Sequence, residues 1–184
     1  MPEPILTPGE PGDGALIARW KAGDERAASQ LVTRHAAAVS RFVASLGARQ
    51  EVEEIVQDTF VRAFASLEGF REESSFRTWL FTIARNLVRD RARSERTRRV
   101  TVPILEAHVA TEHDALDRVV AGETEDRMRN AVQRLSPTQR AVFMLRVTEG
   151  LSYREIATVV GSTEGAARVH YHHAMRAIKE FLDD

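Results

Sequence analysis

Apolar residues recur at spacings of three and four along most of this sequence, and no stretch alternates apolar and polar residues as a strand would. Leu31, His35, Val39 and Phe42 keep this spacing, and the segment 52–67 repeats it. Because such spacing places apolar side chains on one face of an α-helix, the core has to be built from packed helices. We therefore predict an all-α fold.

Breaks in this pattern divide the chain into two helical units. Residues 1–13 hold four of the six prolines together with Gly9 and Gly12, so we expect a disordered arm there. The first predicted unit spans residues 14–98, and the second spans residues 125–184. Residues 99–124 lose the periodicity, and seven acidic residues stand against two arginines between positions 104 and 127. We predict that residues 99–124 form a flexible acidic linker between two small helical domains.

The composition excludes several classes of protein. The chain contains no cysteine, which excludes disulfide scaffolds, thiol nucleophiles and cysteine zinc sites. No apolar run is longer than residues 141–145, and the first residues lack the pattern of a secretory signal. Neither a Gly-rich phosphate loop nor the His-Glu spacing of a metal site is found. We expect a cytoplasmic protein without membrane insertion, enzyme activity, cofactor or bound metal.

The second unit has the pattern of a helix-turn-helix. Ser152 and Glu155 have the spacing of a capping box, and Gly161 marks the end of the short helix that they begin. Ser162 or Thr163 can cap the longer helix that follows, one face of which carries small and polar side chains. Such a face suits the major groove of DNA, although many two-helix hairpins share this pattern without touching DNA.

The segment 70–93 gives a more specific signal. Ser74 or Ser75 can cap its helix, and the side of the helix away from the core carries a polar and basic stripe of Thr78, Thr82, Arg85, Asn86, Arg89 and Arg93. Arginine neutralises phosphate, asparagine reads base edges, and aromatic walls receive an unstacked base, so this stripe suits melted DNA. The alternative is a solvated face, with Trp79 covering the core.

Taken together, these segments resemble the bacterial sigma factors of the extracytoplasmic-function (group 4) type in the sigma-70 family. Residues 52–63, Val-Glu-Glu-Ile-Val-Gln-Asp-Thr-Phe-Val-Arg-Ala, are similar to the helix that binds core polymerase. The Phe-x-Thr-Trp-Leu and Ile-Ala-x-Asn elements within 70–93 are similar to the segment that recognises the −10 element, and residues 135–182 are similar to region 4. The resemblance covers nearly all of residues 15–182 apart from the linker.

The resemblance implies a protein that binds core RNA polymerase, through the β′ clamp helices and the β flap, and directs it to promoter DNA. The residues it places against polymerase are Glu54, Gln57, Asp58 and Arg62. Those it places against the −10 element are Arg71, Ser75, Thr78, Arg85, Asn86, Arg89 and Arg93. Those it places against the −35 element are Ser162, Thr163, Glu164, Arg168, His170, His172, His173 and Arg176. An anti-sigma factor is a further expected partner, with Val61 and Val169 as candidate contacts.

The longer helix of the second unit departs from the family pattern. It carries Ala166-Ala167-Arg168 where members tend to have Thr-Val-Lys, and His170 and His173 where arginine is common. The three histidines have no neighbouring acid, which disfavours a metal site.

The main alternative to a sigma factor is a stand-alone transcriptional regulator with a helical sensor domain. It predicts a ligand pocket or a phosphorylatable aspartate in the first unit, and DNA binding without polymerase.

Overall fold

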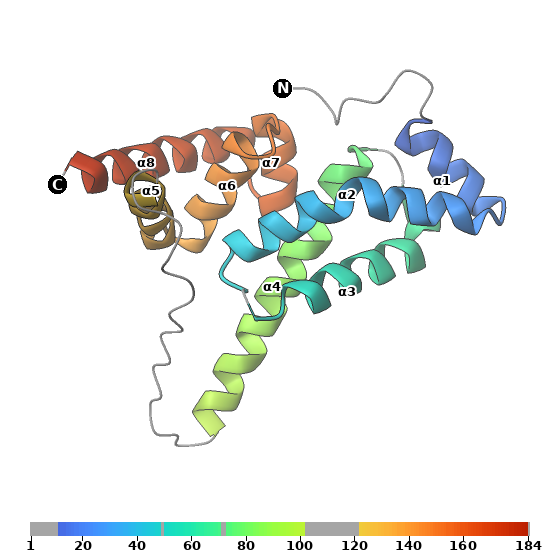
Figure 1. Cartoon of the computed structure of the whole chain (residues 1–184), viewed down its shortest axis with the longest axis horizontal. Helices are drawn as coiled ribbons and strands as arrows, with labels where there is room; N and C mark the ends of the chain where they lie inside the picture. The colour runs from blue at the N-terminus through green and yellow to red at the C-terminus, as the bar shows by residue number, and fades with distance from the viewer. Residues whose placement is uncertain (1–10, 49, 71–72, 102–121, 184) are drawn as a thin grey trace.

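The computed structural model describes residues 11–48, 50–70, 73–101 and 122–183, and all regular structure in these ranges is helical (Figure 1). The N-terminal unit consists of α1 (Asp13–Lys21), α2 (Glu25–Ser45), α3 (Val52–Ala65), a 3-10 turn (Leu67–Gly69) and α4 (Phe76–Thr101). The C-terminal unit consists of α5 (Gly122–Arg134), α6 (Pro137–Val147), α7 (Tyr153–Val160) and α8 (Glu164–Asp183). The prediction of an all-α fold is confirmed.

The predicted arm and linker fall mainly outside the described residues. At the edges of these segments, α1 already begins at Asp13, α4 continues to Thr101 and α5 begins at Gly122. The helices therefore extend a few residues into the segments predicted to be irregular.

The apolar stripes predicted from the sequence form the core of the N-terminal unit. Leu31, Phe42, Ile55 and Phe81 are buried where α2, α3 and α4 meet. The rings of Phe42 and Phe81 meet edge to face with their centroids 5.1 Å apart, an arrangement that aromatic pairs favour. His35 lies on the same stripe of α2 and is also buried.

The helix caps and the glycine turn predicted for the C-terminal unit are present in the structure. Ser152 and Glu155 form a reciprocal capping box at the start of α7. Gly161 has a φ of 65°, a left-handed conformation that glycine adopts without strain, and this makes the tight turn before α8 possible. Of the two candidate caps for α8, Thr163 is the one whose hydroxyl oxygen accepts a hydrogen bond, from the backbone N–H of Ala166 at 3.1 Å.

The two units pack against each other, which the sequence did not predict. In this closed arrangement α7 lies beside the first turns of α4, and α6 lies beside α2 (Figure 1). Buried residues of both units, among them Phe81, Leu145 and Ile156, form one continuous cluster. A smaller cluster joins α5, α6 and α8 within the C-terminal unit. Apolar burial therefore holds the two units together in the free chain.

Candidate nucleic-acid and polymerase interfaces

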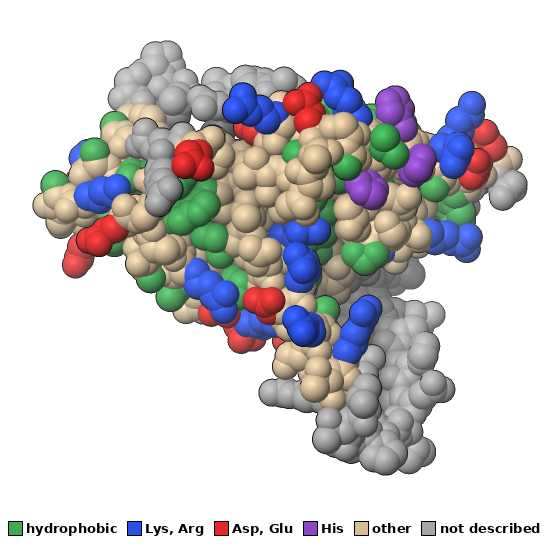
Figure 2. Space-filling view, turned by 180° about the vertical axis from the view of Figure 1, so that it is seen from behind, with side chains coloured by type: hydrophobic (Ala, Val, Ile, Leu, Met, Phe, Trp, Pro, Cys, Tyr) green, Lys and Arg blue, Asp and Glu red, His purple; other side chains and the backbone are tan. Residues whose placement is uncertain are grey.

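The outward face of α4 presents most of the residues predicted to contact the −10 element. Asn86, Arg89 and Arg93 are exposed, and Arg85 is half-buried. Burial lowers the pKa of Arg85, and the charge of Arg89 lowers it further, but arginine remains a cation at neutral pH. Figure 2 shows basic side chains down the middle of this side of the molecule and onto the protruding end of α4. The helix thus offers positive charge around one amide side chain.

The first turn of α4 is fixed by Ser75, whose hydroxyl oxygen accepts a hydrogen bond from the backbone N–H of Thr78 at 3.1 Å. Ser75 is therefore the cap of the helix, one of the two candidates named from the sequence. Arg71, in the preceding loop, lies outside the described residues. Trp79 is half-buried, with its ring centroid 4.8 Å from that of Phe70 and 5.9 Å from that of Phe76. Its position agrees with a role in covering the core.

Thr78 differs from the other residues of the predicted stripe. Its side chain is completely buried, with its hydroxyl 2.9 Å from that of Ser75, and it donates a hydrogen bond to Glu155 of α7 at 3.3 Å. The prediction that Thr78 lies on an open face is therefore wrong for the closed arrangement, because the C-terminal unit covers the first turn of α4. The periodicity of a single helix does not reveal which other unit packs on it.

A buried carboxylate connects the two units next to Thr78. The side chain of Glu149, in the turn between α6 and α7, is only 1% exposed. It forms ion pairs with Arg77 of α4 and with Arg41 of α2, whose Nε lies 3.3 Å from Glu149 Oε1. Arg77 also donates a hydrogen bond to the backbone carbonyl of Glu149 at 2.9 Å. These three residues could not be identified from the sequence, since no spacing connects positions 41 and 77 to position 149.

The residues predicted to bind polymerase lie along the outer face of α3. Glu54, Gln57 and Arg62 are exposed, and Asp58 is half-exposed. Arg91 of α4 reaches this face, with its Nη2 2.8 Å from Glu54 Oε1 and 2.9 Å from Asp58 Oδ2. Its hydrogen bond to Glu54 is the main cause that raises the pKa of Arg91, and the bond to Asp58 adds to it. Part of the acidic charge predicted to face polymerase is therefore already paired within the chain.

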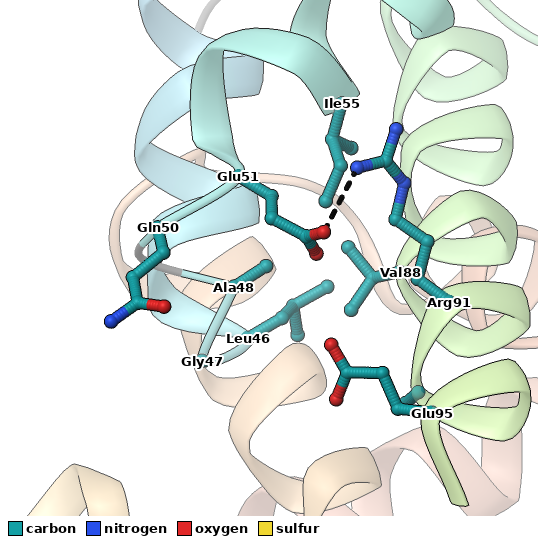
Figure 3. A pocket seen from close by; sticks show the side chains of 10 residues that line it. Leu46, Gly47, Ala48, Gln50, Glu51, Ile55, Val88, Arg91 and Glu95 are labelled. Carbon is teal, nitrogen blue, oxygen red and sulfur yellow. Dashed lines mark ion pairs between the residues drawn. The ribbon is translucent and has the colours of Figure 1, made fainter. Parts of the chain in front are cut away.

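A cavity of about 460 Å³ opens beside this ion-pair network (Figure 3). Its lining includes the apolar side chains of Leu46, Ile55 and Val88 and the charged side chains of Glu51, Arg91 and Glu95. Arg91 also pairs with Glu51 at 3.3 Å, so the cation in this lining is held by three carboxylates of the same unit. The cavity therefore offers little free positive charge to an acidic ligand.

The candidate −35 surface is the outward face of α8 and the turn before it. Ser162, Thr163, Glu164, Arg168, His172, His173 and Arg176 are exposed, and His170 is half-buried. Arg168 pairs with Glu164 at 2.6 Å, and Arg176 approaches Glu180 at 3.8 Å. Figure 2 shows the histidines gathered on this side of the molecule. Within the described residues, no three side chains of the metal-binding types come together.

None of the helices in the described ranges has the length and apolar character needed to cross a membrane.

Comparison with known proteins places the two units in one family. Residues 31–98 match the family model for sigma-70 region 2, and residues 125–178 match the model for sigma-70 region 4. The RNA polymerase sigma factor CnrH of Cupriavidus metallidurans is 32% identical, over 95% of this chain and 96% of that relative. The chain belongs to the extracytoplasmic-function sigma factors of the sigma-70 family.

Two further comparisons also cover most of this sigma factor. The ECF sigma factor BldN of Streptomyces coelicolor is 33% identical over 92% of this chain, which spans 65% of that protein. Among solved structures, the sigma factor RpoE of Bartonella quintana, in complex with the anti-sigma factor NepR, superimposes with a TM-score of 0.71. It is 25% identical, and the match covers 84% of this chain and 96% of that one.

Proposed function

We propose that this sigma factor binds core RNA polymerase and recognises promoters through two separate DNA-binding surfaces. In this proposal residues 14–98 act as region 2, residues 125–184 act as region 4, and residues 99–124 connect them. The observation that carries the proposal is the outward face of α4, where Asn86 stands exposed among Arg85, Arg89 and Arg93. A base-reading amide surrounded by phosphate-neutralising cations suits an unpaired strand better than a small ligand.

The outer face of α3 is the proposed surface for the β′ clamp helices of polymerase. Glu54, Gln57, Asp58 and Arg62 lie on it, with Val61 between them at 60% exposure. Val61 would supply an apolar contact within this otherwise charged surface, as the core of a protein interface does. The C-terminal unit would meet the β flap.

The outward face of α4 is the proposed −10 surface. Asn86 would hydrogen-bond a base edge, whereas Arg89 and Arg93 would hold the strand by its phosphates. The loop that leads to Ser75 would enclose a base that has left the stack.

The outward face of α8 is the proposed −35 surface, which would enter the major groove. Arg168 and Arg176 would contribute the positive charge, and His172 and His173 would contribute hydrogen-bond donors. Because both arginines already have a glutamate one turn away, we expect duplex binding by this helix to be weak without polymerase.

In this role the protein would supply no chemistry of its own and would need no cofactor. It would work in the cytoplasm, where core polymerase and chromosomal DNA are found. An anti-sigma factor would control it, as supported by the likeness to a sigma factor solved with such a partner. Val61 and Val169, both more than half exposed, are the candidate contacts.

Run-off transcription with purified core polymerase tests the proposal. The complete chain should bind core in a pull-down and direct initiation from a subset of promoter fragments of its own genome, whereas core alone should not. A chain that binds duplex DNA tightly without core, and that does not co-purify with core, would instead be a stand-alone regulator.

A further inference from the structure

The ion pairs of Arg41 and Arg77 differ from the other ion pairs that the structure describes, because their acid comes from the other unit. Arg91 takes its carboxylates from α3, and Arg19 pairs with Asp24 inside the N-terminal unit. In contrast, Arg41 and Arg77 converge on Glu149 of the C-terminal unit. If the units separate, these two arginines lose their acidic partner, while Arg91 and Arg19 keep theirs.

The Glu149 carboxylate that these arginines bind resembles a DNA phosphate in its charge and in its hydrogen-bond acceptors. A guanidinium recognises carboxylate and phosphate in the same way, by N–H donors directed at anionic oxygens. Glu149 brings such oxygens to two guanidinium groups from different helices, and Arg77 reaches its carbonyl oxygen as well. Arg41 stays 54% exposed although Glu149 is buried, so the site is open to solvent on one side.

Arg77 lies at the start of α4, next to the proposed −10 surface. Arg77 immediately precedes Thr78, which is the first residue of the predicted DNA-facing stripe and is covered by the same C-terminal unit. Departure of α7 would therefore uncover Thr78 and Arg77 in a single step. Thr78 would then extend the run of Arg85, Asn86 and Arg89 toward the start of α4. Arg77, about 100° further round the helix, would border this surface on the side where Arg41 also reaches Glu149.

We propose that Arg41 and Arg77 form a phosphate-binding site for the promoter strand, and that Glu149 fills this site while the two units are packed together. The proposal rests on the proposed function, in which the units engage separate promoter elements. Glu149 then acts as an internal substitute for a DNA phosphate. Since one anion excludes the other, the closed arrangement and full engagement of the −10 strand are mutually exclusive.

The first experiment measures binding of the free, full-length chain to labelled single-stranded DNA of random sequence, about 12 nucleotides long, which is within the span of one binding domain. Glu149→Gln removes the competing charge and keeps the shape of the side chain. We expect several-fold tighter binding, with a salt dependence steeper by about 0.7 for each phosphate gained. Glu25→Gln is the matched control: it changes the net charge equally at an exposed position in the first turn of α2, and none of the described ion pairs involves Glu25, so binding should not change.

Two further variants keep the test decisive. Glu149→Lys places a third cation against the arginines and should separate the units, which small-angle X-ray scattering detects as an increased radius of gyration. Arg77→Ala combined with Glu149→Gln should return affinity and salt dependence to the wild-type values. The proposal is overturned if the scattering expands without a gain in affinity, if the gain survives Arg77→Ala, or if neither Glu149 variant changes scattering or binding.

Holoenzyme measurements separate this proposal from the proposed function. On a pre-melted promoter template, Arg77→Ala in the holoenzyme should lower the salt slope by about 0.7 for one lost phosphate contact, whereas the remote Arg19→Ala should not change it. An unchanged slope in a holoenzyme that initiates normally rejects the phosphate site alone. A wild-type chain that neither binds core nor directs initiation rejects the proposed function, and the single-strand measurements on the free chain still report on Arg41 and Arg77.

Discussion

His35 Nε2 lies 2.8 Å from Oδ2 of Asp13, and this contact fastens the start of α1 to the middle of α2. Arg34 donates a hydrogen bond to the other oxygen of the same carboxylate at 2.7 Å. Burial alone would raise the pKa of Asp13, but the hydrogen bonds and positive charge of His35 and Arg34 outweigh burial. The pKa of Asp13 is therefore lowered in the folded protein.

A lowered pKa makes Asp13 a source of acid sensitivity. Its stabilisation is complete above the pKa of the unfolded chain and is lost as the pH falls through the folded value, which means below about pH 4. Asp13→Asn should lower the free energy of unfolding by about 1–3 kcal/mol at neutral pH, because the buried His35 loses its anionic partner. It should also flatten the acid limb of the stability curve.

Urea denaturation across the acid range measures both effects. Asp90→Asn is the matched control, since Asp90 is exposed on α4 and takes part in none of the described ion pairs, so its substitution should leave the stability nearly unchanged. An acid limb that is equally steep in the wild type and in Asp13→Asn would contradict the assignment.

Arg62 is a cleaner probe of the polymerase surface than Asp58. The described ion pairs include Asp58 with Arg91 but none for Arg62, so reversing the charge at position 58 sets two cations against each other. We expect Asp58→Arg to cost about 0.5–1 kcal/mol of folding free energy in addition to any loss of polymerase binding. Arg62→Glu should leave the stability within about 0.5 kcal/mol and reduce co-purification with core polymerase. Normal retention of core by Arg62→Glu would remove this residue from the interface.

The position of Asp58 on its helix could be predicted from the sequence, but its ion-pair partner could not. The periodicity of α3 correctly places Asp58 off the core stripe, since that follows from geometry within one helix. Its partner Arg91 is 33 residues away on α4, and no spacing rule joins two helices at a particular register. The free energy cost of changing Asp58 therefore became predictable only from the packed structure.

In the C-terminal unit, too, features set by neighbouring residues could be predicted from the sequence, whereas contacts with the other unit could not. Ser152, Glu155 and Gly161 could be assigned from the sequence, because capping and left-handed turns depend on a few neighbouring residues. The contact of Glu155 with Thr78 and the burial of Glu149 depend on how the two units meet. Burial of a glutamate is uncommon without a partner, and the partners of Glu149 are more than 70 residues away in sequence.

Gly161 and Gly165 offer a matched pair of substitutions around the turn of the helix-turn-helix. Gly161→Ala should lower the stability by about 1 kcal/mol, because a side chain is strained at the φ of 65°. Gly165→Ala should raise the stability by about 0.5–1 kcal/mol, since Gly165 lies in α8 and a methyl group there meets nothing within 4 Å. Thermal unfolding of both variants checks the signs. Equal shifts in the same direction would mean that the turn does not require its left-handed residue.

The polar and basic residues on the outward face of α4 are expected to make different contacts with DNA. Asn86 can form paired hydrogen bonds with a base edge, whereas Arg89 and Arg93 on the same face are suited to phosphates. In the holoenzyme, Asn86→Ala should change the preference among −10 sequences by about 1–3 kcal/mol for the base it reads. Arg89→Ala and Arg93→Ala should weaken opening on all sequences alike and reduce the salt dependence.

The decisive measurement compares one promoter in duplex and in artificially opened form. If Asn86 reads a base, the altered preference of Asn86→Ala persists on the opened template, because melting is no longer required there while the base contact still is. Arg168→Ala in α8 provides the opposite control, since it should weaken binding to the closed duplex and leave the opened template nearly unaffected. Full recovery of Asn86→Ala on the opened form, with the sequence preference of the wild type, would show that Asn86 assists strand separation and reads no base.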